Sequence, residues 1–397
     1  MNLCCSNPVA LTVATEYTYE FYSSISDIRE AEWLKLIPGT DVVLQPGYLK
    51  LLEETQQGNM DFIYALIRKE GGLIGACYFQ VVHFSGSNLV PYFPNTNRFG
   101  EALLWAPKRL VNSISVKLLV SGNLFVTGEK GIYFLSHFSE TERSAFVAAC
   151  VQKIFAMRRD ISAALLPHLY SPESAFDQPF LESCYRRIAV ESDMTMDLPK
   201  GWESFHDYLK SVSSKYRVRA NKILKNSQAI TSKLLTAEEI AAHEDDIFRL
   251  YQEVAGKAYF NIAKFPKSYF LQQKCLTPDT YQVIGYFIEE RLVGFMSLFV
   301  LEHHTEVHYC GIDYSVNKEL SVYQRMLYEV VRYAIEHKIR RLHFGRTAPE
   351  VKSTIGAVPA PMYGYLKHRN PVLNWVMQLF TSQLKPRQYQ LRNPFKD

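Results

Sequence analysis

The stretch of sequence that decides the fold is residues 63–82, IYALIRKEGGLIGACYFQVV, because the chain repeats its pattern 219 residues later. The second copy is residues 282–301, QVIGYFIEERLVGFMSLFVL. In each copy two β-rich runs flank a short charged turn, and Leu-Ile-Gly or Leu-Val-Gly opens the second run. Aromatic and β-branched runs around a polar turn predict a β-hairpin, and the glycine indicates a bulge or a close backbone approach. The sequence therefore predicts two copies of one hairpin.

The segments that follow the two hairpins also match in type and order. After the first hairpin we expect a strand, a helix and a strand, at residues 131–136, 140–159 and 163–169. After the second hairpin we expect the same three elements, at residues 306–313, 321–338 and 341–344. Both helices are predicted from apolar residues at 3.6-residue spacing. Each half then runs hairpin, strand, helix, strand, which indicates a duplicated module with its boundary near residues 198–202.

The composition is that of an ordinary globular protein of two domains. The 397 residues exceed the usual size of one domain, and 47% hydrophobic with 21% charged residues is a folded composition. The net charge of +4 gives no reason to expect a DNA partner. Seven cysteines occur without a CxxC motif or a His/Cys ladder, so we expect neither a metal site nor a disulfide framework.

The N-terminus lacks the features of a secretory signal peptide. The segment MNLCCSNPVALTVATEY has no basic region, and its short apolar run is broken by Pro8. No stretch reaches the roughly 18 uninterrupted apolar residues that a spanning helix needs. We therefore expect a cytoplasmic protein.

The C-terminal half carries a succession of segments that resembles a known family. The segments are YLKSVSSKYRVRANKILKN at 208–226, the second hairpin, YCGID at 309–313, YQRMLYEVVRYAIEHKIRRLHFGRT at 323–347 and EVKSTIGAVPAPMYGYL at 350–366. Their order and spacing resemble the FemAB-like branch of the GNAT superfamily of acyltransferases. The resemblance covers residues 200–370 well and residues 30–198 only through the repeat.

This resemblance implies an α/β fold of two tandem GNAT-like modules, each a mixed, mostly antiparallel sheet flanked by helices. We expect an N-terminal module at 1–198, a catalytic C-terminal module at 199–370, and an amphipathic helix with a basic tail at 371–397. The implied activity is N-acyl transfer from an activated donor to an amine of a cell-envelope precursor or a long-chain lipid base. The implied co-substrate is an acyl-CoA, an acyl-carrier thioester or an aminoacyl-tRNA.

Two other functions stay open. The chain could be an aminoacyl-tRNA-dependent peptidoglycan branching enzyme, although residues 236–273 are too few for the long helical arm that such enzymes often carry. It could also be a non-catalytic recognition module that keeps the GNAT groove without the chemistry.

One departure from the superfamily concerns the acyl-CoA phosphates. A GNAT module that uses acetyl-CoA has a glycine-rich loop before its main helix, whose N–H groups hold the pyrophosphate. The corresponding residues 314–324 and 136–144 contain no glycine. Because glycine permits the close backbone approach that such a loop needs, ordinary acetyl-CoA chemistry is the least favoured version of the activity.

The basic run between residues 210 and 225 supplies the first candidate binding residues. Lys215, Arg219 and Lys222 share one helix face and have no acidic residue among them. We interpret them as contacts for donor phosphates on tRNA, a carrier arm or a lipid headgroup. The alternative is a solvated helix face.

The candidate catalytic residues gather around the strand predicted at 306–313. Amine acylation needs a proton acceptor and a hydrogen-bond donor for the leaving group or the oxyanion. His308 or Asp313 is predicted as the base, and Tyr309 or Tyr323 as the proton donor. The alternative for His308 is a structural histidine on a strand.

The segment FGRT at 344–347 supplies a further set. Polar residues after a strand-end glycine lie where open α/β sheets expose their sites. Arg346, Thr347 and Lys352 are predicted to anchor an anionic donor or substrate. Alternatively, Glu350 pairs with Arg346 or Lys352 in a structural ion-pair network.

The last candidate is an amphipathic helix at 371–384. Val372, Trp375, Val376, Leu379 and Phe380 share a face, and four basic residues follow. We expect this face to be docked on the protein core. The alternative is peripheral contact with an anionic surface of the inner membrane.

Overall fold

The computed structural model describes residues 16–85, 115–127, 131–168, 177–257, 264–302, 304–381 and 389–396. The chain forms two compact units. Unit 1 consists of Met1–Glu191 and Pro361–Arg387, and unit 2 of Ser192–Ala360 and Gln388–Asp397. Unit 1 therefore includes a segment from near the C-terminus that interrupts unit 2, whereas the ranges 1–198, 199–370 and 371–397 expected from the sequence are contiguous.

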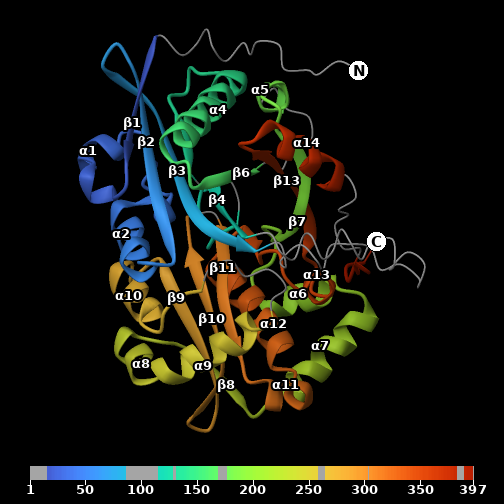
Figure 1. Ribbon diagram of the computed structural model, residues 1–397. Coiled ribbons are helices and arrows are strands. Elements are labelled where there is room, and N and C mark those ends of the chain that lie inside the picture. The colour runs from blue at the N-terminus through green and yellow to red at the C-terminus, as the bar shows by residue number, and fades with distance from the viewer. Residues whose placement is uncertain are drawn as a thin grey trace. The chain divides into compact units, whose positions relative to one another are not determined.

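Unit 1 is built on a sheet of six strands in the order β1-β2-β3-β4-β6-β13 (Figure 1). All neighbours are antiparallel except β4 and β6, which are parallel. The elements of this unit are β1 (Tyr17–Tyr22), α1 (Glu30–Trp33), α2 (Pro46–Thr55), β2 (Met60–Lys69), β3 (Gly72–Ser85), β4 (Ser115–Ser121), β5 (Ile132–Phe134), α4 (Glu140–Met157), β6 (Ile161–His168), α5 (Asp177–Glu182), most of β13 (Val358–His368) and α14 (Pro371–Thr381).

Unit 2 repeats this plan with the strand order β8-β9-β10-β11-β12-β7. Again all neighbours are antiparallel except one parallel pair, β11 and β12. Its elements are the end of β7 (Arg186–Asp197), α6 (Phe205–Ser211), α7 (Ser214–Asn226), β8 (Ile230–Leu234), α8 (Ala237–Ala242), α9 (Glu244–Ala255), α10 (Tyr269–Leu276), β9 (Tyr281–Ile288), β10 (Arg291–Val300), β11 (His304–Ile312), α11 (Tyr314–Leu320), α12 (Val322–Glu336), β12 (Arg341–His343) and α13 (Pro349–Ser353). The predicted fold class, two mixed and mostly antiparallel sheets flanked by helices, is confirmed.

The duplication extends to single residues of the two hairpins. Every pair of residues in the β9–β10 register corresponds to a pair in the β2–β3 register shifted by 219 positions. Glu70 and Glu289 both adopt a left-handed conformation, with φ of 50° and 54°. Both registers also shift just before Gly75 and Gly294, so each second strand carries the predicted bulge at the same place.

The helices after the hairpins confirm most of the predicted elements. The helices predicted at 140–159 and 321–338 are α4 and α12, and the strands predicted at 163–169, 306–313 and 341–344 are β6, β11 and β12. The strand predicted at 131–136 is shorter, since β5 covers only Ile132–Phe134. The sequence prediction also missed β4, which pairs with β3 ahead of β5. The two short strands together occupy the edge of β3 that one strand was expected to fill.

Two separate apolar cores hold the units together. In unit 1, α4 packs its apolar face on β2, β3, β4 and β6, and its first turn is closed by a capping box between Ser139 and Glu142. In unit 2, α12 packs on one face of β10 and β11, since a Cβ added to Gly294 would meet Met326 and Val322. The next position in that register, Gly311, faces α9 instead, because its Cβ would meet Leu250. Helices therefore cover both faces of the unit 2 sheet.

None of the helices in the described part of the chain is long and apolar enough to cross a membrane.

Candidate functional site

The strands β11 and β12 of unit 2 run side by side for only three residues and then part. His304, Thr305 and Glu306 pair with Arg341, Leu342 and His343, after which β11 continues to Ile312. We refer to the region beyond the last pair, at the carboxyl ends of the two strands, as the opening, since α/β sheets expose their sites there. The candidate residues of unit 2 are therefore placed relative to this opening.

A β-bulge lies on β11 within the stretch that no longer pairs with β12. Met296 pairs with Cys310 and Leu298 pairs with Val307, so two residues, His308 and Tyr309, stand opposite the single residue Ser297. The Ser297 hydroxyl accepts the Tyr309 N–H at 3.0 Å and donates to the Tyr309 carbonyl at 3.2 Å. A bulge turns consecutive side chains to new directions and is frequent beside active sites. The two strongest catalytic candidates from the sequence therefore share this bulge.

The imidazole of His308 packs among aromatic rings. Its ring centroid lies 4.6 Å from that of Tyr309 and 4.8 Å from that of Phe299. The rings of Phe265, Tyr269 and Tyr281 stand between 5.7 and 5.9 Å away. These rings come from α10 and from the segments on either side of it, so an aromatic surface borders the bulge. The catalytic roles assigned to His308 and Tyr309 stay predictions.

Asp313 lies at the end of β11, where it caps α11. Its carboxylate accepts the Ser315 N–H at 2.9 Å and the Ser315 hydroxyl at 2.5 Å, and it forms an ion pair with Arg291. Burial favours a higher pKa, but the hydrogen bonds from Ser315 and the Arg291 guanidinium outweigh it and lower the pKa of the Asp313 carboxyl. A carboxylate held ionised by three partners is poorly suited to accept a proton near neutral pH.

Tyr323 lies in the first turn of α12, next to the stretch that lacks glycine. Burial raises the pKa of its phenol, so the hydroxyl stays protonated and can donate. Its own backbone N–H donates to the Asn317 side chain at 2.9 Å. In place of a phosphate-binding loop, residues 314–320 form α11, and one first-turn amide of α12 is already bonded. In unit 1, Glu140 and Glu142 occupy the first turn of α4, where they disfavour an anion.

The loop after β12 carries the three residues predicted to bind an anion. Lys352 is buried on α13 and donates from Nζ to the carbonyls of Phe344 at 2.6 Å and Gly345 at 3.2 Å. In the chain between Gly345 and Lys352, Arg346 is half-buried and Thr347 is exposed. Glu350, weighed as an ion-pair partner, accepts the Gln390 N–H at 3.1 Å. Lys352 therefore fixes the backbone of the loop, while Arg346 and Thr347 project from it.

Lys215, Arg219 and Lys222 are all exposed on α7, a helix without acidic residues. Their common face matches the sequence prediction of a cationic surface, and their role in donor binding stays a prediction. Burial raises the pKa of the Tyr328 phenol on α12, and the nearby Arg219 guanidinium opposes this effect.

A polar cluster at the start of the opening was missed by the sequence prediction. The carboxylate of Asp193, on β7, accepts a hydrogen bond from His343 Nδ1 at 2.7 Å and from the Gly345 N–H at 3.0 Å. The His343 ring stands 5.3 Å from that of His304, whose Nε2 is 3.5 Å from a Glu306 carboxylate oxygen. Alternation in HTEVH at 304–308 could have placed His304 and Glu306 on one face, but nothing local links Asp193 to His343.

The C-terminal helix α14 differs from the expectation of a docked apolar face. Val372 is 69% exposed and Trp375 is 59% exposed, so neither packs on the core. The helix is held instead by Asn374, whose side chain donates to the Cys184 carbonyl at 2.9 Å and accepts the His368 N–H at 2.8 Å. The side chains of Leu379 and Phe380 lie outside the described residues. Of the predicted face, Val372 and Trp375 are therefore not docked, whereas Val376 is half-buried.

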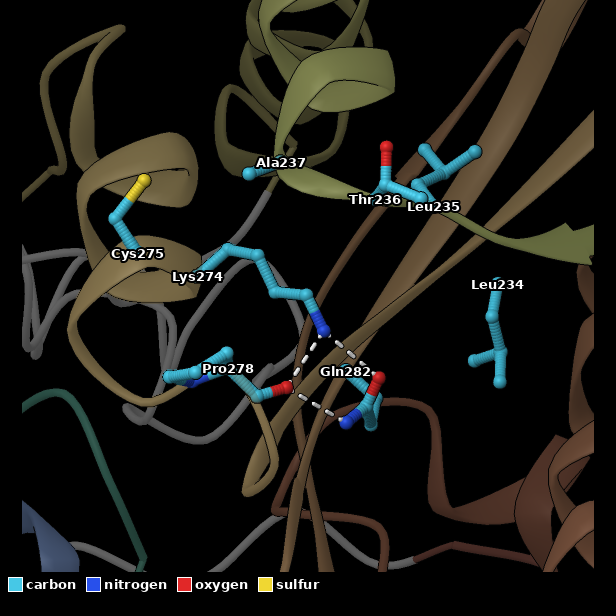
Figure 2. Close-up of a pocket in the computed structure, with 8 residues that line it drawn as sticks. All are labelled: Leu234, Leu235, Thr236, Ala237, Lys274, Cys275, Pro278 and Gln282. Carbon is cyan, nitrogen blue, oxygen red and sulfur yellow. Dashed lines mark hydrogen bonds between the residues drawn. The ribbon is translucent and has the colours of Figure 1, made fainter.

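A surface pocket of about 340 Å³ lies elsewhere in unit 2, between α8, α10 and the start of β9 (Figure 2). Lys274 at its base donates to the carbonyls of Pro278 and Tyr281 and to the Gln282 side chain, at 2.8 to 3.1 Å. The Gln282 amide in turn donates to the Pro278 and Asp279 carbonyls. These polar groups close the turn between α10 and β9, so we assign the pocket a structural origin and not a catalytic one.

Two further classes of chemistry are unsupported in the described part of the chain. No group of three or more His, Cys, Asp or Glu side chains there is arranged to hold a metal ion. Burial raises the pKa of the Cys310 thiol, which borders the opening, to about 11. That thiol stays protonated at neutral pH and is a poor nucleophile.

Comparisons with known proteins identify the fold. No family model matches the sequence, and no curated protein matches it. Among solved structures, a tandem GNAT protein from the clavulanic acid biosynthesis pathway matches with a TM-score of 0.52 and 12% identity, covering 90% of this chain and 99% of its own. FemX matches with a TM-score of 0.51 and 10% identity, covering 90% and 100%. Both matches span both units, and the chain therefore has the fold of the tandem GNAT proteins, as its resemblance to the FemAB-like branch implied.

Proposed function

We propose that the protein is an N-acyltransferase that moves an acyl or aminoacyl group from an activated donor to an amine, with the chemistry confined to unit 2. The observation that carries the proposal is that the β11–β12 pairing ends at Glu306 and His343, beside polar side chains, in a fold whose solved neighbours include GNAT proteins. We expect the amine to attack the donor carbonyl directly, without a covalent enzyme intermediate.

The donor is proposed to lie along the opening, with its anionic part toward Arg346, Thr347 and the cationic face of α7. A guanidinium that projects from a fixed loop is a good partner for phosphate, because it offers two parallel donors. The capping box of α4, and the Tyr323 N–H of α12 that is already bonded to Asn317, argue against an ordinary acetyl-CoA donor. A long-chain acyl thioester or an acyl-carrier thioester fits better, and an aminoacyl-tRNA is the alternative.

The acceptor is proposed to be an amine on a cell-envelope precursor or a lipid, reached by peripheral contact with a membrane surface. Support comes from the exposed side chains of Val372 and Trp375 on α14, since tryptophan and aliphatic residues favour the interfacial region of a bilayer. Residues 351–396 contain seven Lys and Arg and no Asp or Glu, which suits an anionic surface.

The test is a turnover assay on the full chain with a panel of donors and amine acceptors. The donors are acyl-CoA thioesters of short and long chain, acyl-carrier thioesters and aminoacyl-tRNA, and the acceptors are an amino acid, an amino sugar and a long-chain primary amine. Free thiol and amide product are measured together. We expect amide formation with at least one thioester, and an increase in KM for that donor of tenfold or more in Arg346→Ala.

The matched control for Arg346→Ala is Arg340→Ala, which removes an exposed arginine just before β12. The control should leave the KM of the donor unchanged. His308→Ala tests the predicted base in the same assay. Absence of turnover with every donor, in a protein that still binds amines or acyl groups, would overturn the proposal in favour of the recognition module.

A further inference from the structure

A cluster of four polar side chains lies at the point where β11 and β12 begin to part. Glu306 and His343 form the last residue pair between these strands. His304 precedes Glu306 by two positions on β11, and Asp193 approaches from β7. Leu342, the neighbour of His343, is buried in the core under α12, so the cluster lies on the opposite face of the sheet.

The geometry inside the cluster orients one imidazole. Asp193 is fully buried, at 0% exposure, and its two carboxylate oxygens accept the His343 Nδ1–H and the Gly345 N–H. A buried carboxylate that accepts from Nδ1 fixes the ring and leaves Nε2 of the neutral imidazole as a proton acceptor. The His343 side chain is 21% exposed, so this ring is accessible at its edge.

Unit 1 shows that the fold does not need these polar groups. The shared hairpin register places Leu118 and Val120 of unit 1 at the positions of His304 and Glu306. The next two strand pairs place Leu165 at the position of His343 and Gly364 at the position of Asp193. These positions were matched by starting from the hairpin strands β3 and β10, which correspond with a shift of 219 residues, and following the residue pairs of each sheet from strand to strand.

Each member of the cluster is therefore apolar or glycine in the other copy of the same module. A buried carboxylate and two imidazoles cost free energy that aliphatic residues avoid. Polar residues that the scaffold can do without, and that appear in one copy only, call for a function.

We propose that Asp193 and His343 form the proton-accepting pair for the acceptor amine, and that Glu306 attracts this amine as its ammonium form. The inference rests on the proposed acyl transfer and names the acceptor site within it. It assigns the proton to His343, because a fully buried carboxylate accepts a hydrogen bond from the Nδ1 of this ring.

The reaction balances with these groups alone. The acceptor arrives as an ammonium ion, His343 Nε2 takes one proton and passes it to solvent, and the Asp193 carboxylate stabilises the imidazolium. The amine nitrogen then attacks the carbonyl carbon of the donor, so that an N–C bond forms and the C–S bond breaks. The second proton of the nitrogen ends on the leaving sulfur, and the products are an amide and a thiol.

Several titratable and charged groups lie around His343. From β11 these are His304 and Glu306, and from β7 they are Asp193 and Asp197. Asp197 is bound to Arg341, the residue two positions before His343, and this hydrogen bond lowers the pKa of the Asp197 carboxyl.

The test compares His343→Gln, Asp193→Asn and Glu306→Gln with the wild-type chain across pH, with His206→Gln as the control for an exposed histidine. In His343→Gln, we expect kcat/KM to fall about 100-fold or more and its acidic limb to disappear. In Asp193→Asn, the limb should move to lower pH, because the carboxylate that stabilised the imidazolium is gone. In Glu306→Gln, the KM of the amine should rise more than kcat falls.

Proton NMR of the histidine C2–H resonances supplies a readout that does not depend on turnover. The His343 resonance, assigned by its loss in His343→Gln, should titrate in the wild type and shift its midpoint to lower pH in Asp193→Asn. A His343 that shows no titration down to pH 5 overturns the inference. So does an unchanged pH profile of kcat/KM in a folded His343→Gln, although acyl transfer itself would then stand. Absence of turnover in the wild-type chain removes the proposed function, and this inference with it.

Discussion

The two units differ most at one point of the same strand. In unit 2, β11 passes the opening as one strand, with only His308 and Tyr309 standing opposite Ser297. In unit 1, β4 ends at Ser121 and β5 resumes at Ile132, so ten residues lie where unit 2 has two. The N–H of Gly122 donates to the Tyr78 carbonyl, and the Gly131 carbonyl accepts the Tyr78 N–H, both at 2.8 Å, which closes this longer segment at its base.

This difference teaches that the duplicated fold was kept while the edge of the opening was changed. Unit 1 surrounds the equivalent opening with Leu118, Val120 and Leu165, whereas unit 2 surrounds it with histidines and carboxylates. Asp313 also has an apolar counterpart in unit 1. The Asp313 N–H donates to the Val293 carbonyl, and at the matching place in unit 1 the Leu135 N–H donates to the Ile74 carbonyl. Unit 1 thus serves as an internal reference for unit 2, and the predictions below use it as one.

The largest expected effect comes from giving unit 2 one residue of unit 1. His343→Leu leaves the Asp193 carboxylate buried without its imidazole, and we expect the free energy of unfolding to fall by about 3 kcal/mol. The double variant His343→Leu with Asp193→Asn should recover more than half of that loss. Urea unfolding followed by circular dichroism measures both. Equal stability of the two variants would mean that Asp193 is not held by His343.

The next effect compares two glycines at the same position of the repeat. A Cβ added to Gly75 would stand 2.3 Å from the ring of Phe134, whereas one added to Gly294 would meet its nearest neighbours, Met326 and Val322, at 3.2 Å. We expect Gly75→Ala to lower the free energy of unfolding by about 2–3 kcal/mol and Gly294→Ala by about 1 kcal/mol. Thermal unfolding of the two variants decides the order, and a reversed order would break the comparison.

A smaller effect concerns the cap of α11. Asp313→Ala should cost about 1–2 kcal/mol at pH 7 through loss of the cap. Because folding lowers the pKa of the Asp313 carboxyl, its contribution is present above the unfolded pKa and is lost as the pH falls through the folded pKa. The stability difference between wild type and variant should therefore shrink on acidification. Leu135→Ala, at the matching position of unit 1, should show no such pH dependence.

The smallest effect on stability is expected in unit 1 at α14. Trp375→Ser removes a side chain that is 59% exposed, so the melting temperature should stay within about 2 °C. Co-sedimentation with vesicles of anionic phospholipid should nevertheless weaken by fivefold or more. Leu234→Ser, an exposed aliphatic residue of β8 in unit 2, is the control and should bind as the wild type does. Equal loss in both variants would place the membrane contact elsewhere.

The sequence predicted those features that rest on local pattern. The hairpins, α4 and α12 were found because apolar periodicity and the Leu-Val-Gly repeat are properties of short windows. The interruption between β4 and β5 was not predicted, because the pattern of two short strands does not show that both pair with the same edge of β3. The place of β13 beside β6 was also missed, because hydrophobic pattern shows that a strand is buried and not which edge accepts it.

The candidate site was predicted in part for the same reason. Arg346, Thr347 and Lys352 fall in one segment, and the structure places Arg346 and Thr347 on the loop after β12 and Lys352 on α13, which follows it. Asp193 and His343 are 150 residues apart and meet only because β7 and β12 pair. Lys352 shows that the sequence pattern does not reveal what a side chain binds. This lysine was predicted to anchor an anion, and in the structure its Nζ donates to two backbone carbonyls.

The exchange of strands between the units has a consequence for biosynthesis. Unit 1 completes its sheet with Tyr363–His368 of β13, which pair with residues of β6 that are made 195 to 205 positions earlier. N-terminal domains usually fold while the rest of the chain is still being translated. Unit 1 cannot complete its sheet in this way, because β13 is made only when nearly the whole chain has been translated. A nascent chain stalled before residue 363 would therefore leave the edge of β6 unpaired and exposed to edge-to-edge association.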